Sequence, residues 1–229
     1  MYSPDKLLYT GKTKDVYTVR NHPDLFILYF KDNILGRKGI PDSGGNEVVG
    51  QLPGKGKAVL ALTSLFFGLL GRAGIKTHFI KELSSGRILI RRTDRIPIEF
   101  ICRNYACGSY MRRNPCAQKF KKLGGLIEYT LKSDAADDPL LPEKKALDFM
   151  TAEEKSRIDR IIAKINRVSA EFLKRAGVKL VDFKSEFGRR SGELILVDDF
   201  STDTARFADG RNHILSPKNL CLILTRRQA

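Results

Sequence analysis

Polar and apolar side chains alternate along a segment near the C-terminal end of this 229-residue chain. Over residues 178–187 the alternation has a period of two, which predicts a β-strand. One face of that strand would carry Asp182, Lys184 and Glu186, while the opposite face would be apolar. A half-buried strand with three charged side chains on one face needs an electrostatic explanation.

The residues that follow predict a hairpin. Residues 188–192 form a short glycine-bounded loop, and the apolar run 193–197 predicts a returning strand that brings Asp198 beside the charged face. Carboxylates brought this close repel one another unless a cation lies between them or water reaches them. A divalent cation such as magnesium and a solvated hairpin with an ordinary ion pair both fit the pattern. The polar run 198–206, directly after an apolar strand, favours a binding site.

A long helix is predicted over residues 151–177. Thr151 and Glu154 have the spacing of a capping box, and Gly177 supplies a stop signal. The apolar side chains between them recur at helical spacing, which indicates a face packed in the core: Ile158, Ile161, Ile162, Ile165, Val168, Phe172 and Leu173.

The first half of the chain predicts mostly sheet, with strands over 7–19 and 24–30 and a further pair over 77–81 and 87–92. Residues 32–57 contain seven glycines and two prolines, which predicts one long loop. An apolar helix follows over 58–72. A new strand begins near Pro97, so we predict a boundary there between two lobes, residues 1–96 and 97–229.

Composition points to anionic partners. Lysine and arginine number 41 against 26 acidic residues, giving a formal charge of +15. There is no tryptophan, no basic run longer than two residues and no alternation of basic and aromatic residues, so small phosphorylated substrates explain the charge better than nucleic acid. The four cysteines include no C-x-x-C pair, and no stretch predicts a membrane span or a signal segment. A cytoplasmic protein is therefore expected.

Two further segments are candidates for anion binding. Gly11, Lys12 and Lys14 lie between two predicted strands, where backbone amides and ammonium groups favour phosphate, although the motif taken alone favours a solvated hairpin with two exposed lysines. Arg103 and Ser109 flank a strand-to-loop transition that suits a phosphate or carboxylate. No nucleophile pattern of the Ser-His-Asp or Cys-His kind is present, which argues against covalent catalysis.

Seven segments, in this order, resemble the SAICAR synthetase family. They are G-K-T-K-D-V-Y at 11–17, P-G-K-G at 53–56, T-H-F at 77–79, I-P-I-E-F-I-C-R-N-Y-A-C-G-S at 96–109, L-K-S-D-A-A-D-D-P at 131–139, L-V-D-F-K-S-E-F-G at 180–188 and D-D-F-S-T-D-T-A-R at 198–206. The resemblance implies a two-lobed α+β fold with the ATP site in the cleft between an N-terminal antiparallel sheet lobe and a larger C-terminal lobe.

The resemblance also implies an ATP- and magnesium-dependent ligase of purine biosynthesis. Such an enzyme joins carboxyaminoimidazole ribonucleotide to L-aspartate through an acyl phosphate, giving the succinocarboxamide, ADP and phosphate. Its partners would be these small molecules, without nucleic acid or membrane, and a homodimer is possible. A binding protein that has lost turnover, or a ligase for another amino acid or carboxylate, is the alternative.

The resemblance assigns roles to individual residues. Contacts to ATP are implied for Gly11, Lys12, Lys14 and Lys132. Magnesium ligation is implied for Glu186 and Asp198. Ribonucleotide binding is implied for Arg103, Ser109 and Arg206, and the catalytic residues would be Lys184 and Arg206. Asp182 and Asp203 lie in the same segments without an assigned role.

Two regions depart from the family's pattern. The loop after the third strand usually has a Ser/Thr-Ala pair and an Asp or Asn, but residues 32–39 here read D-N-I-L-G-R-K-G. Residues 208–229 differ from the family's usual C-terminal helix with its arginine. Substrate contacts from these two regions are therefore not assigned.

Overall fold

The computed structural model describes residues 2–42, 44–84, 86–131 and 139–225. The strands are β1 (Pro4–Thr10), β2 (Lys14–Val19), β3 (His22–Phe30), β4 (Asn33–Arg37), β5 (Ile40–Pro41), β6 (Glu47–Gln51), β7 (Phe79–Leu83), β8 (Arg87–Arg91), β9 (Asp94–Tyr105), β10 (Lys122–Leu131), β11 (Leu140–Leu141), β12 (Lys179–Arg190), β13 (Glu193–Val197) and β14 (Ala205–Ala208). The helices are α1 (Lys55–Arg72), α2 (Ser109–Arg113), α3 (Glu143–Ala146), α4 (Ala152–Arg175) and α5 (Pro217–Thr225).

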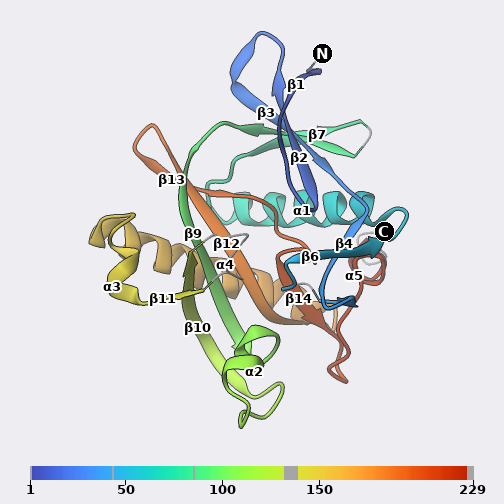
Figure 1. The fold of residues 1–229 in the computed structure, drawn as a ribbon, viewed down its shortest axis with the longest axis vertical. Helices are drawn as coiled ribbons and strands as arrows, with labels where there is room; N and C mark the ends of the chain where they lie inside the picture. Colours follow the sequence, from blue (N-terminus) through green and yellow to red (C-terminus); the bar gives the residue numbers. More distant parts are fainter. Residues whose placement is uncertain (1, 43, 85, 132–138, 226–229) are drawn as a thin grey trace.

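Three antiparallel sheets build the molecule (Figure 1). The N-terminal sheet has the order β1-β2-β3-β8-β7, and the larger sheet has the order β11-β10-β9-β12-β13 with β14 paired to β12. The predicted α+β class is confirmed. Strand β9 begins at Asp94 and runs through Pro97 without a break, so the chain passes from the N-terminal part to the larger sheet within one strand.

The third sheet corrects the prediction of one long loop over 32–57. Its order is β5-β4-β6, and α1 begins at Lys55. The glycines that suggested a loop allow tight packing, because a Cβ on Gly36 would lie 2.2 Å from the Ile40 carbonyl oxygen. The Asp32 carboxylate accepts the backbone N–H groups of Gly54 at 3.0 Å and Gly56 at 2.8 Å, and so caps α1 from a distant part of the sequence.

The predicted hairpin near the C-terminal end is tighter than expected. Strand β12 continues to Arg190, and the turn consists of Ser191 and Gly192, both with positive φ. Two consecutive positive φ values are typical of the turns whose twist matches that of paired strands. The register pairs Glu186 with Val197. Asp198, the next residue, therefore lies beside the charged face of β12, as predicted.

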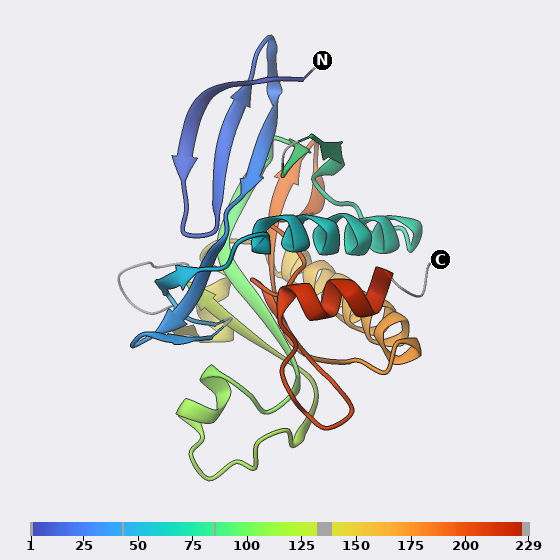
Figure 2. The ribbon, with the colours of Figure 1, turned by 90° about the vertical axis from the view of Figure 1, so that its right-hand side faces the viewer.

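Helices α1, α4 and α5 pack on one side of the larger sheet (Figure 2). Helix α4 contacts β12 and α1, and α1 also contacts α5. The capping box at Thr151 is present, and the predicted apolar face of α4 enters the core through Ile158, Ile162, Ile165 and Leu173. Among the helices that the structure describes, none has the length and apolar character needed to cross a membrane.

Replacing the capping residue should weaken α4 measurably. Thr151→Ala removes the side-chain acceptor of the Glu154 N–H at 3.1 Å and should lower the free energy of unfolding by about 1 kcal/mol in urea denaturation. Ser156→Ala, at an exposed position of the same helix, serves as the control and should change stability by at most a few tenths of a kcal/mol. Equal stability of the two variants would contradict the capping role.

Candidate active site

A cleft of about 750 Å³ lies where the three sheets meet. The N-terminal sheet supplies an apolar end lined by Val16, Phe26, Leu28 and Ile90. The larger sheet supplies a charged wall. Of the residues predicted for the site, the cleft is lined by Gly11, Lys12, Lys14, Arg103, Ser109, Lys184, Asp198 and Arg206. Glu186 is buried next to this wall, and Lys132 lies outside the described residues.

The loop from Gly11 to Lys14 is held by residues from the neighbouring strands. The Gly11 N–H donates to the Lys14 carbonyl at 2.8 Å, and Lys31 Nζ donates to the Gly11 carbonyl at 2.9 Å. Asn33 Nδ2 donates to the Lys12 carbonyl at 2.7 Å. A Cβ on Gly11 would lie 3.0 Å from the Lys14 carbonyl, which explains the glycine. These contacts hold the backbone of the loop at the edge of the cleft.

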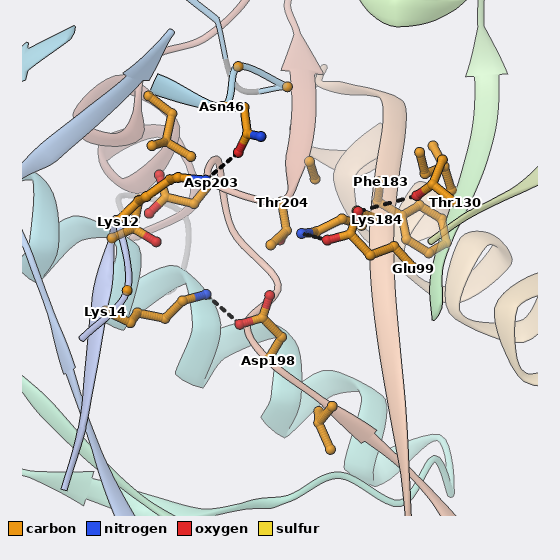
Figure 3. A pocket seen from close by; sticks show the side chains of 18 of the residues that line it. Lys12, Lys14, Asn46, Glu99, Thr130, Phe183, Lys184, Asp198, Asp203 and Thr204 are labelled. Carbon is orange, nitrogen blue, oxygen red and sulfur yellow. Dashed lines mark hydrogen bonds and ion pairs between the residues drawn. The ribbon is translucent and has the colours of Figure 1, made fainter. Parts of the chain in front are cut away.

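Lys14 crosses the cleft to two carboxylates on the opposite wall (Figure 3). Its ammonium lies 2.5 Å from Asp198 Oδ1 and also contacts Asp199. Burial acts to lower the pKa of Lys14, but the charges of Asp198 and Asp199 outweigh it and raise the pKa above its usual value. Lys14 therefore supplies the positive charge that the sequence pattern required next to Asp198.

Lys184 neutralises a second group of carboxylates. Its Nζ donates to Glu99 Oε1 at 2.5 Å and lies 3.5 Å from Glu186 Oε1, while the Arg95 guanidinium contacts the other Glu186 oxygen. The Thr130 hydroxyl donates to Glu99 at 3.3 Å. Despite burial, the neighbouring carboxylates raise the pKa of Lys184, so this lysine is charged at neutral pH.

The donor set fits magnesium bound to a nucleotide. Glu186 lies opposite Val197 in the β12–β13 pair, and Asp198 is the next residue, so the two carboxylates come from adjacent positions of the hairpin. Magnesium in nucleotide sites takes one or two carboxylates and completes its shell with phosphate oxygens and water. The protein alone provides no more than that: across residues 2–42, 44–84, 86–131 and 139–225, no three or more His, Cys, Asp or Glu side chains are arranged to hold a metal.

Two arginines share one carboxylate at the other end of the charged wall. Asp182 Oδ2 accepts from Arg103 Nη1 at 3.2 Å and from Arg206 Nη1 at 2.9 Å. Arg103 also donates to Ser109 Oγ at 2.8 Å, and Arg206 Nη2 donates to Asp42 Oδ1 at 2.7 Å. Arg103 is 1% exposed and Arg206 8%, so both guanidinium groups are largely removed from water. The cluster presents fixed N–H donors suited to phosphate or carboxylate.

Glycines make room for Arg206. A Cβ on Gly108 would lie 2.5 Å from the guanidinium, and its backbone has a φ of +54°. A Cβ on Gly44 would also lie 2.5 Å from Arg206 Nη2. A side chain at position 108 would therefore displace the arginine.

Asp203 forms a buried pair with Lys55 at the base of the cleft. The two charged atoms lie 2.5 Å apart, and both side chains are nearly inaccessible to water. Burial raises the pKa of Asp203 to about 6, although the Lys55 ammonium acts in the opposite direction. His78 is also buried here, and burial lowers its pKa to about 4. His78 is therefore neutral at physiological pH.

Comparison with known proteins identifies the family. A family model described as SAICAR synthetase matches residues 7–219. The phosphoribosylaminoimidazole-succinocarboxamide synthase of Persephonella marina is 38% identical over 206 residues, which cover 89% of this chain and 83% of the relative. The chain belongs to the SAICAR synthetase family.

Solved structures of SAICAR synthetases share the fold. The phosphoribosylaminoimidazole-succinocarboxamide synthase of Ehrlichia chaffeensis has a TM-score of 0.84 at 32% identity, with 96% of this chain and 92% of that chain covered. A SAICAR synthetase solved in complex with ADP has a TM-score of 0.82 at 31% identity, with 92% and 88% covered. The resemblance stated from the motifs is confirmed.

Three carboxylates that pair with cleft cations of this SAICAR synthetase family member were not singled out from the sequence. Glu99, on β9, pairs with Lys184, and Asp199 pairs with Lys14. Asp42 comes from the segment expected to be a loop and reaches Arg206. A signal for Glu99 was present, because Glu99 and Arg103 share one face of a predicted strand. No signal in the sequence placed Asp42 next to Arg206.

Asp182 should be needed for stability as well as for the site. Asp182→Ala leaves two buried guanidinium groups without their shared carboxylate, and we expect the free energy of unfolding in urea to fall by about 3 kcal/mol. Asp5→Ala removes an exposed carboxylate 3.8 Å from Arg20 and should have an effect within about 0.5 kcal/mol. A similarly small loss for Asp182→Ala would show that the cluster is not held by this residue.

Proposed function

We propose that this protein joins carboxyaminoimidazole ribonucleotide to L-aspartate with ATP, in keeping with relatives named phosphoribosylaminoimidazole-succinocarboxamide synthase. The observation that carries the proposal is the arrangement of one cleft: a glycine-lysine loop beside an apolar end, facing Lys184 and the Arg103–Arg206 cluster. A phosphate-binding loop and a carboxylate-binding wall in the same cleft are what an ATP-dependent carboxylate ligase requires.

ATP would occupy the side of the cleft formed by the N-terminal sheet. The adenine would lie in the apolar end, against Val16, Phe26 and Leu28. The phosphates would then reach the backbone and ammonium groups of residues 11–14, where a glycine allows close approach. A relative of the same fold is described as solved in complex with ADP, which supports nucleotide binding here.

The ribonucleotide would bind at the arginine cluster. Arg103, Arg206 and the Ser109 hydroxyl converge on a small region, and each arginine already holds a carboxylate of the protein. A phosphate or carboxylate entering this region meets donors that are already oriented, so less conformational entropy is lost on binding. Lys184, on the same strand as Asp182, would then lie beside the reacting carboxylate.

The reaction would proceed in two displacements. A carboxylate oxygen of the ribonucleotide attacks the γ-phosphorus of ATP, forming an O–P bond as the bond to ADP breaks. The aspartate amine then attacks the acyl carbon, phosphate leaves, and the amine loses a proton. Lys184, Lys12 and Lys14 would neutralise the charge on the transferring phosphoryl group, so catalysis is mainly positioning and electrostatics.

Magnesium would be held by Glu186 and Asp198 together with the phosphates. When bound, it would neutralise phosphate charge and align the γ-phosphate. The Lys14 ammonium contacts the Asp198 carboxylate, so nucleotide binding would require Lys14 to exchange the carboxylates for phosphate oxygens.

Two further predictions stay untested. They are the division into two lobes at residues 1–96 and 97–229, and a homodimer. A cytoplasmic location is supported by four free thiols.

Removing the Lys184 ammonium should abolish most turnover. Purified protein with the ribonucleotide, L-aspartate, ATP and magnesium should release ADP, and Lys184→Met should lower kcat/KM by roughly 10²- to 10³-fold. Lys179→Met, on the same strand but outside the cleft, should stay within about twofold. Folded protein that shows no aspartate-dependent ADP release would rule out the proposed reaction, and a panel of other amino acids would then identify a variant substrate.

The metal role has a separate test. Asp198→Asn and Glu186→Gln should each raise the magnesium concentration for half-maximal ADP release roughly tenfold, because each removes a ligand charge. Glu193→Gln, an exposed carboxylate of the same hairpin, should leave that concentration unchanged. If the first two variants kept the wild-type magnesium dependence, these residues would not be the ligands.

A further inference from the structure

His78 is a buried side chain that the proposed mechanism does not use, yet it lies at the cleft. It is 3% exposed, and its ring packs edge-on against Phe67 with centroids 5.7 Å apart. Its Nε2 lies 2.8 Å from the backbone carbonyl oxygen of Asp198. Because a carbonyl can only accept, His78 donates through Nε2–H, which fixes the ring tautomer.

The backbone of His78 is fixed from both sides. Its N–H donates to the Leu196 carbonyl at 2.9 Å, and its carbonyl accepts the Arg91 N–H at 2.8 Å. Thr77 forms a parallel bridge with Leu196. Leu196 belongs to β13 of the larger sheet and Arg91 to β8 of the N-terminal sheet. His78 is therefore held at the junction of the two sheets, and its ring has little freedom to move.

The residue that receives this hydrogen bond has an unusual backbone. Asp198 has a φ of +68°, in the left-handed region that non-glycine residues seldom occupy. Such a conformation persists only where surrounding contacts maintain it. Here it ends β13 abruptly and directs the Asp198 carboxylate across the cleft toward Lys14 (Figure 3). An ordinary extended backbone at this position would continue β13 and send the side chain elsewhere.

We propose that His78 is a positioning residue for the metal ligand Asp198. By holding the Asp198 carbonyl, it maintains the left-handed backbone that presents the carboxylate to a metal-nucleotide complex. The inference rests on the magnesium role in the proposed function, and it concerns a residue that would touch neither metal nor substrate. A histidine that merely fills the core would leave metal binding unaffected when replaced by a side chain of similar size.

The test compares ADP binding with and without metal. Dissociation constants for ADP are measured by calorimetry in excess Mn²⁺ and again in EDTA, and bound Mn²⁺ is counted by electron paramagnetic resonance. His78→Leu should weaken ADP binding roughly 10- to 100-fold in Mn²⁺ but by less than about twofold in EDTA. A loss of this size is typical when a residue that orients a metal ligand is removed. His78→Gln, which keeps an N–H donor, should recover most of the metal effect.

Two controls separate positioning from general damage. Tyr129→Phe removes a partly buried hydroxyl that contacts Asp159 at 3.1 Å, away from the cleft, and should alter neither dissociation constant. If His78→Leu does not fold, His78→Asn provides the same comparison with His78→Gln, because its amide is too short to reach the Asp198 carbonyl. Thermal unfolding is recorded for every variant.

The outcomes distinguish the two proposals. A wild-type protein that binds ADP equally well in Mn²⁺ and in EDTA would contradict the metal role, and the His78 inference would fall with it. A wild-type metal effect that survives in the variants lacking the donor would overturn the positioning role alone. Equal weakening in Mn²⁺ and in EDTA would also overturn it, because that result marks a structural histidine.

Discussion

The antiparallel pairing of β9 with β12 is the interaction on which the candidate site depends. Its register places Arg103 opposite Asp182, and Glu99 opposite Glu186 with Lys184 diagonal to it. Charges of opposite sign on neighbouring strands stabilise each other, whereas a shift of β12 by one residue would turn Asp182, Lys184 and Glu186 to the apolar face. Helix α4 and the aromatic core share the apolar face of β12, opposite its charged side chains, so the register is specified by burial as well as by charge.

Charge balance within the cleft is the second constraint. Five cations at the cleft have a carboxylate partner: Lys14 with Asp198, Lys184 with Glu99, Arg103 and Arg206 with Asp182, and Lys55 with Asp203. An unpaired charge at such depth would cost several kcal/mol. In the proposed function, a ligand would enter by exchanging partners. Phosphate groups would displace the carboxylates from Lys14, and a metal would then bind the carboxylates that Lys14 releases, so phosphate and metal would favour each other's binding.

Much of this arrangement could be predicted from the sequence, and the remainder depends on contacts between distant segments. The alternation over 178–187 predicted the charged face of β12 because that face is local, and Thr151 with Glu154 predicted a cap for the same reason. The small sheet over 33–51 was missed, since glycines at close contacts look like loop glycines when the partner strand is unknown. Asp42 reaches Arg206 across 164 positions of sequence, and no local pattern encodes that approach.

The junction of the two sheets connects these constraints. Asp198 receives Lys14 from the N-terminal sheet through its side chain and His78 through its backbone, while its own strand belongs to the larger sheet. A displacement of one sheet relative to the other would alter both contacts at once. The Asp198 carboxylate would therefore be placed to bind magnesium in only one relative position of the two sheets. Magnesium binding would then stabilise that position, and that position would strengthen magnesium binding, because coupling between two equilibria is reciprocal.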